Sequence, residues 1–81
     1  MYLKGMKEKV LEILTELRPE FDFTEEVNFI EEGMLDSFDI VSLVDALNTE
    51  FQIIIDGVDI VPENFSSVET IIELVNKSEK V

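Results

Sequence analysis

Apolar residues recur along three stretches of this 81-residue chain at the spacing of helices that are buried on one side. Between residues 37 and 51 they follow one another at steps of three, one, three and four, which keeps them on one face. Pro19 marks the end of the first helix, and Ser66 to Glu69 read as a capping box before the last. The predicted helices cover about residues 3–17, 37–51 and 67–77. We therefore expect an all-α bundle of three main helices in a single domain, residues 1–81.

The connections between these helices also carry apolar residues. Five large ones are scattered between residues 21 and 30, and we expect two of them, Phe29 and Ile30, to anchor this loop over the helix ends. Residues 52–61 alternate in a strand-like way, but a lone pair of strands is marginally stable, so a loop is preferred to a hairpin. Pro62 opens a short helical turn that ends at Phe65, which adds one short helix to the three main ones.

Composition removes most kinds of chemistry. The chain has no cysteine and no histidine, which excludes a disulfide scaffold, a thiol nucleophile, a histidine base and nearly all zinc or haem sites. Asp56 to Asp59 lacks the pattern of a calcium loop, so no metal site is expected. The longest apolar run, Ile53 to Ile55, is too short to span a membrane, and the start of the chain lacks a secretory core. These features predict a cytoplasmic protein.

The charge is unevenly distributed as well as large. The net charge is −13, and all six cations lie before Pro19 or after Asn76, while fifteen carboxylates lie between. Such a surface repels nucleic acid and anionic lipid, and it attracts proteins that carry Lys and Arg patches. The separation also predicts that the central region forgoes internal ion pairs.

A serine at the start of the second helix is the candidate for chemistry. Asp36 is the predicted N-cap, with Asp39 at the third helical position, and Ser37 falls in the first turn. Serine at a helix start is more often a cap than a reactive group, but here Asp36 already serves as the cap. Unpaired N–H groups and the helix dipole favour an anion at this point, so a phosphate ester on the Ser37 oxygen would be well placed.

The run from Glu31 to Asp39 (EEGMLDSFD) resembles the acyl carrier protein superfamily, whose members carry phosphopantetheine on the serine of a Gly-x-Asp-Ser motif. One residue more than usual separates Gly33 from Asp36 and Ser37. The resemblance continues through the apolar spacing that ends at Phe51 and covers nearly the whole chain. It implies a carrier-protein fold with phosphopantetheine from coenzyme A attached to Ser37, and Asp36 as part of the motif.

The resemblance also implies a carrier rather than an enzyme, acting as a monomer. A separate phosphopantetheinyl transferase would modify Ser37, and an acyl or aminoacyl ligase or transferase would load the cofactor thiol. Downstream synthases with basic patches would then receive the cargo. We expect them to dock on the surface beside Ser37, which comprises Met34, Phe38, Asp39, Val41 and Asp45.

The kind of carrier stays open. Residues 31–38 are similar to D-alanyl carrier proteins, which usually have a tryptophan-containing segment before the last helix, and this chain has no tryptophan. Residues 62–67 are similar to carriers that adenylating ligases serve, including peptidyl-type ones. A stand-alone carrier of a specialised pathway fits both similarities. An alternative from a different class is an unmodified acidic helical adaptor.

Overall fold

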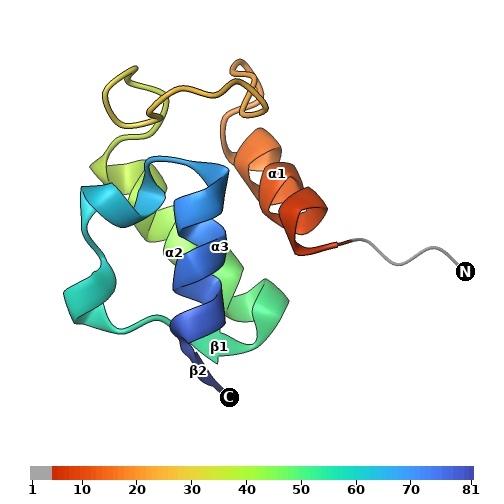
Figure 1. Cartoon of the computed structure of the whole chain (residues 1–81), viewed down its shortest axis with the longest axis vertical. Coiled ribbons are helices and arrows are strands. Elements are labelled where there is room, and N and C mark those ends of the chain that lie inside the picture. Colours follow the sequence, from red (N-terminus) through yellow and green to blue (C-terminus); the bar gives the residue numbers. More distant parts are fainter. Residues whose placement is uncertain (1–4) are drawn as a thin grey trace, which may run out of the picture.

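The computed structural model, which describes residues 5–81, places three helices around one core (Figure 1). The predicted start of the first helix at Leu3 lies outside the described residues. Between the second and third helices the chain makes two short 3-10 turns. A two-residue strand after the second helix pairs with a two-residue strand near the C-terminus. The elements are α1 Met6–Leu17, α2 Ser37–Phe51, β1 Ile53–Ile54, η1 Gly57–Asp59, η2 Pro62–Phe65, α3 Val68–Lys77 and β2 Glu79–Lys80. The predicted all-α bundle is confirmed.

The first helix packs against both of the others. In Figure 1, α2 runs behind α3, and the long loop 18–36 crosses the upper end of the molecule before it enters α2. The C-terminus lies at the opposite end, beside β1. Within residues 5–81, every helix falls short of the length and apolar content that a membrane crossing requires.

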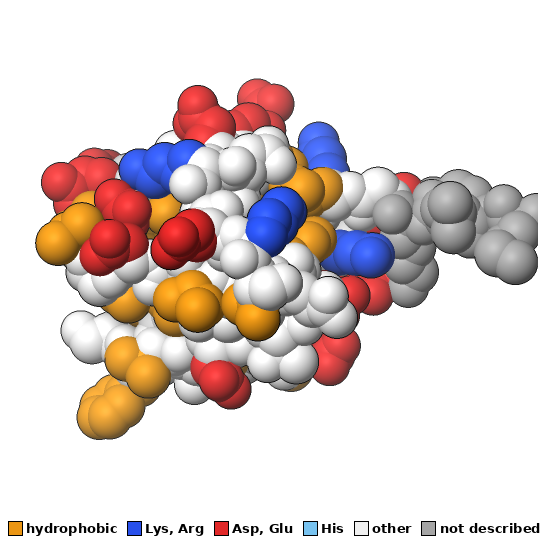
Figure 2. Space-filling model, turned by 90° about the horizontal axis from the view of Figure 1, so that it is seen from below, with side chains coloured by type: hydrophobic (Ala, Val, Ile, Leu, Met, Phe, Trp, Pro, Cys, Tyr) orange, Lys and Arg blue, Asp and Glu red, His pale blue; other side chains and the backbone are white. Residues whose placement is uncertain are grey.

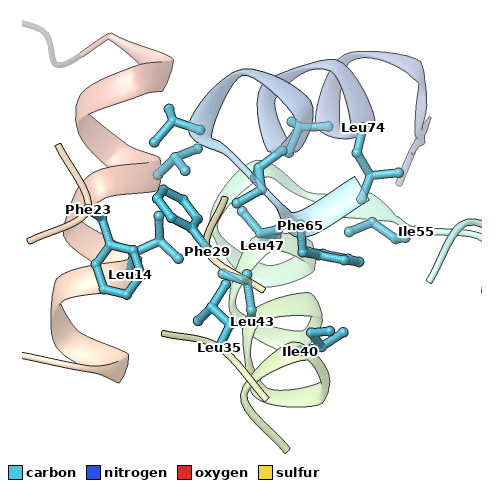
Figure 3. Close-up of a cluster of buried hydrophobic side chains, with 14 of the residues drawn as sticks. Leu14, Phe23, Phe29, Leu35, Ile40, Leu43, Leu47, Ile55, Phe65 and Leu74 are labelled. Atoms are coloured by element: carbon cyan, nitrogen blue, oxygen red, sulfur yellow. The ribbon is translucent and has the colours of Figure 1, made fainter. Parts of the chain in front are cut away.

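The core is formed by the helical stripes that the spacing predicted. Leu14 of α1, Leu43 and Leu47 of α2 and Ile71 of α3 have no exposed surface. Phe65 of η2 is also fully buried, and it lies beside Leu47 and Ile55 (Figure 3). Burying one such side chain stabilises the fold by about 1.5–3 kcal/mol. These contacts therefore fix where α2 lies and which of its residues face the solvent.

The long loop is anchored by two phenylalanines. Phe23 and Phe29 are both buried, and their rings pack edge to face with 5.0 Å between centroids. The Phe29 N–H also donates to the Ser66 carbonyl at 2.8 Å, which ties the loop to the end of η2. Ile30 is only partly buried, so the predicted pair of anchors is corrected to Phe23 and Phe29.

Residues 52–61 are neither a plain loop nor a hairpin. Ile53 and Ile54 pair antiparallel with Lys80 and Glu79, so the partner strand comes from the end of the chain. Ile53 is buried and Ile54 is exposed, as the alternation indicated. The expected loop was wrong here because α3 brings a segment distant in sequence alongside β1.

The capping box of α3 lies one residue later than predicted. The Ser67 Oγ accepts the Thr70 N–H at 3.1 Å, and the Thr70 Oγ1 accepts the Ser67 N–H at 3.1 Å. Ser66 instead donates its hydroxyl to the Glu63 carbonyl at 3.0 Å, because it still belongs to the turn that ends η2.

Candidate functional site

The chain reaches the start of α2 through a short, pinned turn. Gly33 has a φ of 72°, in the left-handed region that glycine adopts without strain. The next two N–H groups, those of Met34 and Leu35, donate to the Phe29 carbonyl at 2.8 and 3.3 Å, and both side chains are buried. The buried Met34 and Leu35 therefore fix the position of the residues that follow them at the start of α2.

Asp36 caps α2, as the sequence predicted. Its Oδ1 accepts the Asp39 N–H at 3.0 Å, and the Asp39 Oδ2 accepts the Asp36 N–H at 3.0 Å, which completes a reciprocal capping box. Both acidic side chains are thereby held at the first turn of the helix.

Ser37 is the first residue of α2, and its side chain is exposed. The Asp39 and Ile40 N–H groups are taken by Asp36, whereas the Ser37 and Phe38 N–H groups precede the first intrahelical bond. Free N–H groups and the positive end of the helix dipole favour an anion. The exposed hydroxyl and its surroundings therefore fit a phosphate ester.

Arg18, which the sequence analysis did not single out, joins this site to the end of α1. Its Nε donates to the Asp39 Oδ2 at 2.9 Å, its Nη2 to the Asp36 Oδ2 at 3.3 Å, and its Nη1 to the Glu20 Oε2 at 3.0 Å. It is the only arginine of the chain, and it directly precedes the proline that ends the first predicted helix. That isolated cation before a long acidic region was the one signal of its role.

The charges at this site stabilise one another. Burial alone would raise the pKa of Asp39, but the hydrogen bonds from Arg18 and from the Asp36 N–H outweigh it and hold that pKa below its usual range. The hydrogen bonds to Asp39 and Glu20 likewise raise the pKa of Arg18. Both groups therefore stay ionised at neutral pH.

The family model for the phosphopantetheine attachment site matches residues 5–75, which include all of α1 and α2 and most of α3. The chain belongs to this family. Its members carry a covalently attached phosphopantetheine, and such carrier domains are not themselves enzymes. They work with a phosphopantetheinyl transferase and with partner enzymes. No curated protein and no solved structure matches the chain significantly.

The carrier exposes only part of the expected docking surface. Phe38 and Val41 are 85% and 68% exposed, and Asp45 is exposed on the same helix. Met34 is 5% exposed because it packs into the core, and Asp39 is 8% exposed because it turns towards Arg18. The expectation for these two residues is corrected, since neither side chain is available to a partner in this conformation.

The carrier's cations fold back onto its acidic region, so the predicted lack of ion pairs was wrong. Lys9 lies 3.7 Å from Glu50 and Lys77 lies 3.3 Å from Asp59, in addition to the contacts of Arg18. Figure 2 shows Lys and Arg side chains next to Asp and Glu on one face. The separation along the chain is lost in space because α1 and α3 pack against the central region.

The segment 33–41 lies outside a pocket beside α1. A pocket of about 490 Å³ opens between α1, residues 23–29 and the start of α3. None of its lining residues belongs to the segment 33–41. Ser37 does not line this pocket, and its side chain is exposed, so another protein can reach it.

Proposed function

We propose that Ser37 is the attachment serine and that this chain carries an acyl or aminoacyl group as a thioester for a biosynthetic pathway. The observation that carries the proposal is the exposed Ser37 hydroxyl at the first residue of α2, beside a cap that Asp36 provides. Ser37 is not needed to start the helix, so its oxygen is free for chemistry.

The attachment is a single phosphoryl-group exchange with coenzyme A. The Ser37 Oγ forms a bond to the phosphorus that bears pantetheine, and the bond from that phosphorus to the pyrophosphate bridging oxygen breaks. Adenosine 3′,5′-bisphosphate leaves, and the hydroxyl proton passes to a base of the transferase. The Ser37 and Phe38 N–H groups and the helix dipole favour the phosphodiester that results.

The remaining chemistry belongs to the cofactor and to the partners. Phosphopantetheine on Ser37 would supply the thiol on which the cargo is held as a thioester. A ligase that adenylates the acid, or an acyltransferase, loads it, and synthases consume it. The chain contributes a stable anchor and raises the effective concentration of the cargo at each partner's site through tethering.

We assign the docking surface to Phe38, Val41 and Asp45. The first two residues place exposed apolar area within one turn of Ser37, and Asp45 adds a negative charge on the same helix. Apolar contact supplies affinity, while the carboxylate speeds the encounter with a basic partner.

Intact-mass measurement after incubation with coenzyme A and a broad-specificity phosphopantetheinyl transferase tests the attachment site. The wild type should gain the mass of one phosphopantetheine, and Ser37→Ala should gain none. Ser42→Ala is the matched control, because Ser42 is also exposed on α2. A modified Ser37→Ala, or a wild type that no competent transferase modifies, would refute the proposal and favour the unmodified adaptor.

The docking surface is tested by charge reversal. Asp45→Lys should raise the KM of the transferase for the carrier more than Glu73→Lys, which makes the same change at an exposed position of α3. Equal effects of the two substitutions would show that only the net charge matters.

A further inference from the structure

Arg18 lies where the end of α1 meets the start of α2, and both its backbone and its side chain are held. Its N–H donates to the Leu14 carbonyl at 2.9 Å, which fixes it at the last turn of α1. Its guanidinium spans 21 positions of sequence to Asp39 and 18 to Asp36. The two helices are thus joined through the carboxylates on either side of Ser37.

The negative charge of these carboxylates exceeds the positive charge of the helix N-terminus. The N-terminus of α2 contributes a partial charge of about +0.5, whereas ionised Asp36 and Asp39 contribute two full negative charges. A phosphodiester on Ser37 adds a third within the same turn. Within residues 5–81, the ion pairs that reach this helix start both come from Arg18.

The contacts of Arg18 also set geometry. Its Nε and Nη2 both lie 2.9 Å from the Asp39 Oδ2, the oxygen that also accepts the Asp36 N–H. The guanidinium is thus a fork of donors, with Nε donating to the Asp39 carboxylate and Nη2 to the Asp36 carboxylate, and it orients both. The Asp39 carboxylate in turn sets the backbone of Asp36, directly before Ser37.

We propose that Arg18 is a positioning residue for phosphopantetheine attachment. It holds the capping box of Asp36 and Asp39 in place and offsets its negative charge. The Ser37 oxygen can then accept the phosphopantetheinyl group, and the resulting phosphodiester is stabilised. This inference rests on the proposed function of Ser37. Arg18 acts through the two carboxylates, so its substitution affects the transfer step and the stability of the modified chain together.

Three variants distinguish this positioning role from a purely structural one, in which Arg18 acts as a staple that only stabilises the packing of the two helices. Arg18→Gln removes the charge, Arg18→Lys keeps the charge but loses the fork of donors, and Lys9→Gln is the control. The control removes the same charge from α1, and its partner Glu50 lies near the other end of α2. The kcat of a purified broad-specificity transferase is measured with coenzyme A and each variant, at a temperature well below the Tm of the variant. The Tm of the apo form and that of the holo form are measured separately by thermal unfolding.

We expect Arg18→Gln to lower kcat at saturating carrier by roughly tenfold, the effect of one lost charge-assisted hydrogen bond, while Lys9→Gln stays within about twofold. The Tm of the holo form relative to the apo form should fall by several degrees in Arg18→Gln and be unchanged in Lys9→Gln. Arg18→Lys should restore this Tm difference and only part of kcat.

A wild-type kcat for Arg18→Gln, or an equal loss of Tm in its apo and holo forms, would reduce Arg18 to a structural staple and overturn the inference. If Arg18→Gln does not fold, Arg18→Lys decides, because an unchanged kcat in that variant contradicts the role of the fork. Absence of modification in the wild type would instead refute the proposed function, and the inference with it.

Discussion

The starts of α2 and α3 are built to the same hydrogen-bonding plan from different chemistry. Each helix opens on a reciprocal capping box, Asp36 with Asp39 in α2 and Ser67 with Thr70 in α3. The box of α3 uses two hydroxyls, which satisfy the backbone without adding charge. The box of α2 uses two carboxylates, and Arg18, directly after α1, donates to both of them.

This difference follows what each helix start does. The hydroxyl box only has to begin α3, and it is complete within four residues. The carboxylate box leaves the Ser37 hydroxyl out of the cap and exposed to partners. With the proposed function of Ser37, a serine is structural at one helix start and chemical at the other, and the residue that caps the helix decides which.

The largest expected effect exchanges the roles of the two serines. Ser37→Ala should abolish modification while changing the free energy of unfolding by less than about 0.5 kcal/mol, because Asp36 still caps α2. Ser67→Ala should be fully modified but lose about 1 kcal/mol of stability with its cap. Intact mass and urea denaturation measure the two properties. A strongly destabilised Ser37→Ala would contradict the division of roles.

The next effect compares the second members of the boxes. Asp39→Ala should lower the free energy of unfolding by about 2–3 kcal/mol, because the Asp36 N–H and the Arg18 Nε both lose their acceptor. Thr70→Ala should cost only about 1 kcal/mol. Chemical denaturation of both variants gives the comparison, and equal losses would show that Arg18 adds nothing to the α2 box.

Acid should weaken one box and spare the other. The pKa of Asp39 is lowered in the folded chain, so its contribution is complete above the unfolded value of about 4 and is lost as the pH falls through the lower folded value. Hydroxyls do not titrate in this range. Thermal melts between about pH 6 and pH 2 should therefore show a flatter acid limb in Asp39→Asn and a wild-type slope in Thr70→Ala. A wild-type slope in Asp39→Asn would exclude this carboxylate as the source.

The smallest effect tests the register of the α3 box. Ser66→Ala should change the free energy of unfolding by less than about 0.5 kcal/mol, because the Ser66 hydroxyl donates to the Glu63 carbonyl of the preceding turn and takes no part in the cap. Urea denaturation of Ser66→Ala and Ser67→Ala compares their free energies of unfolding. A larger loss of stability in Ser66→Ala than in Ser67→Ala would show that Ser66 caps α3, as the sequence alone suggested.

Local rules predicted much of the fold and the position of the candidate site. The apolar spacing located all three helices, and Asp36 was recognised as the cap of α2 because capping depends on residues only three apart. Features made by distant residues were missed, such as the pairing of Ile53 and Ile54 with the end of the chain. The error over Ser66 and Ser67 was a shift of one position, since either residue could begin a helix on local grounds.

The sequence by itself determined the helices, the acidic surface and the exposed serine that follows a cap, because each depends on composition or on spacing within a few turns. Only the tertiary structure decided that Asp39 is buried against Arg18 rather than offered to partners, and that Met34 belongs to the core. It also decided that Lys9 and Lys77 pair with carboxylates distant in sequence. The physical reason is that charge and burial act through space, and these residues come together only when α1 and α3 pack around α2.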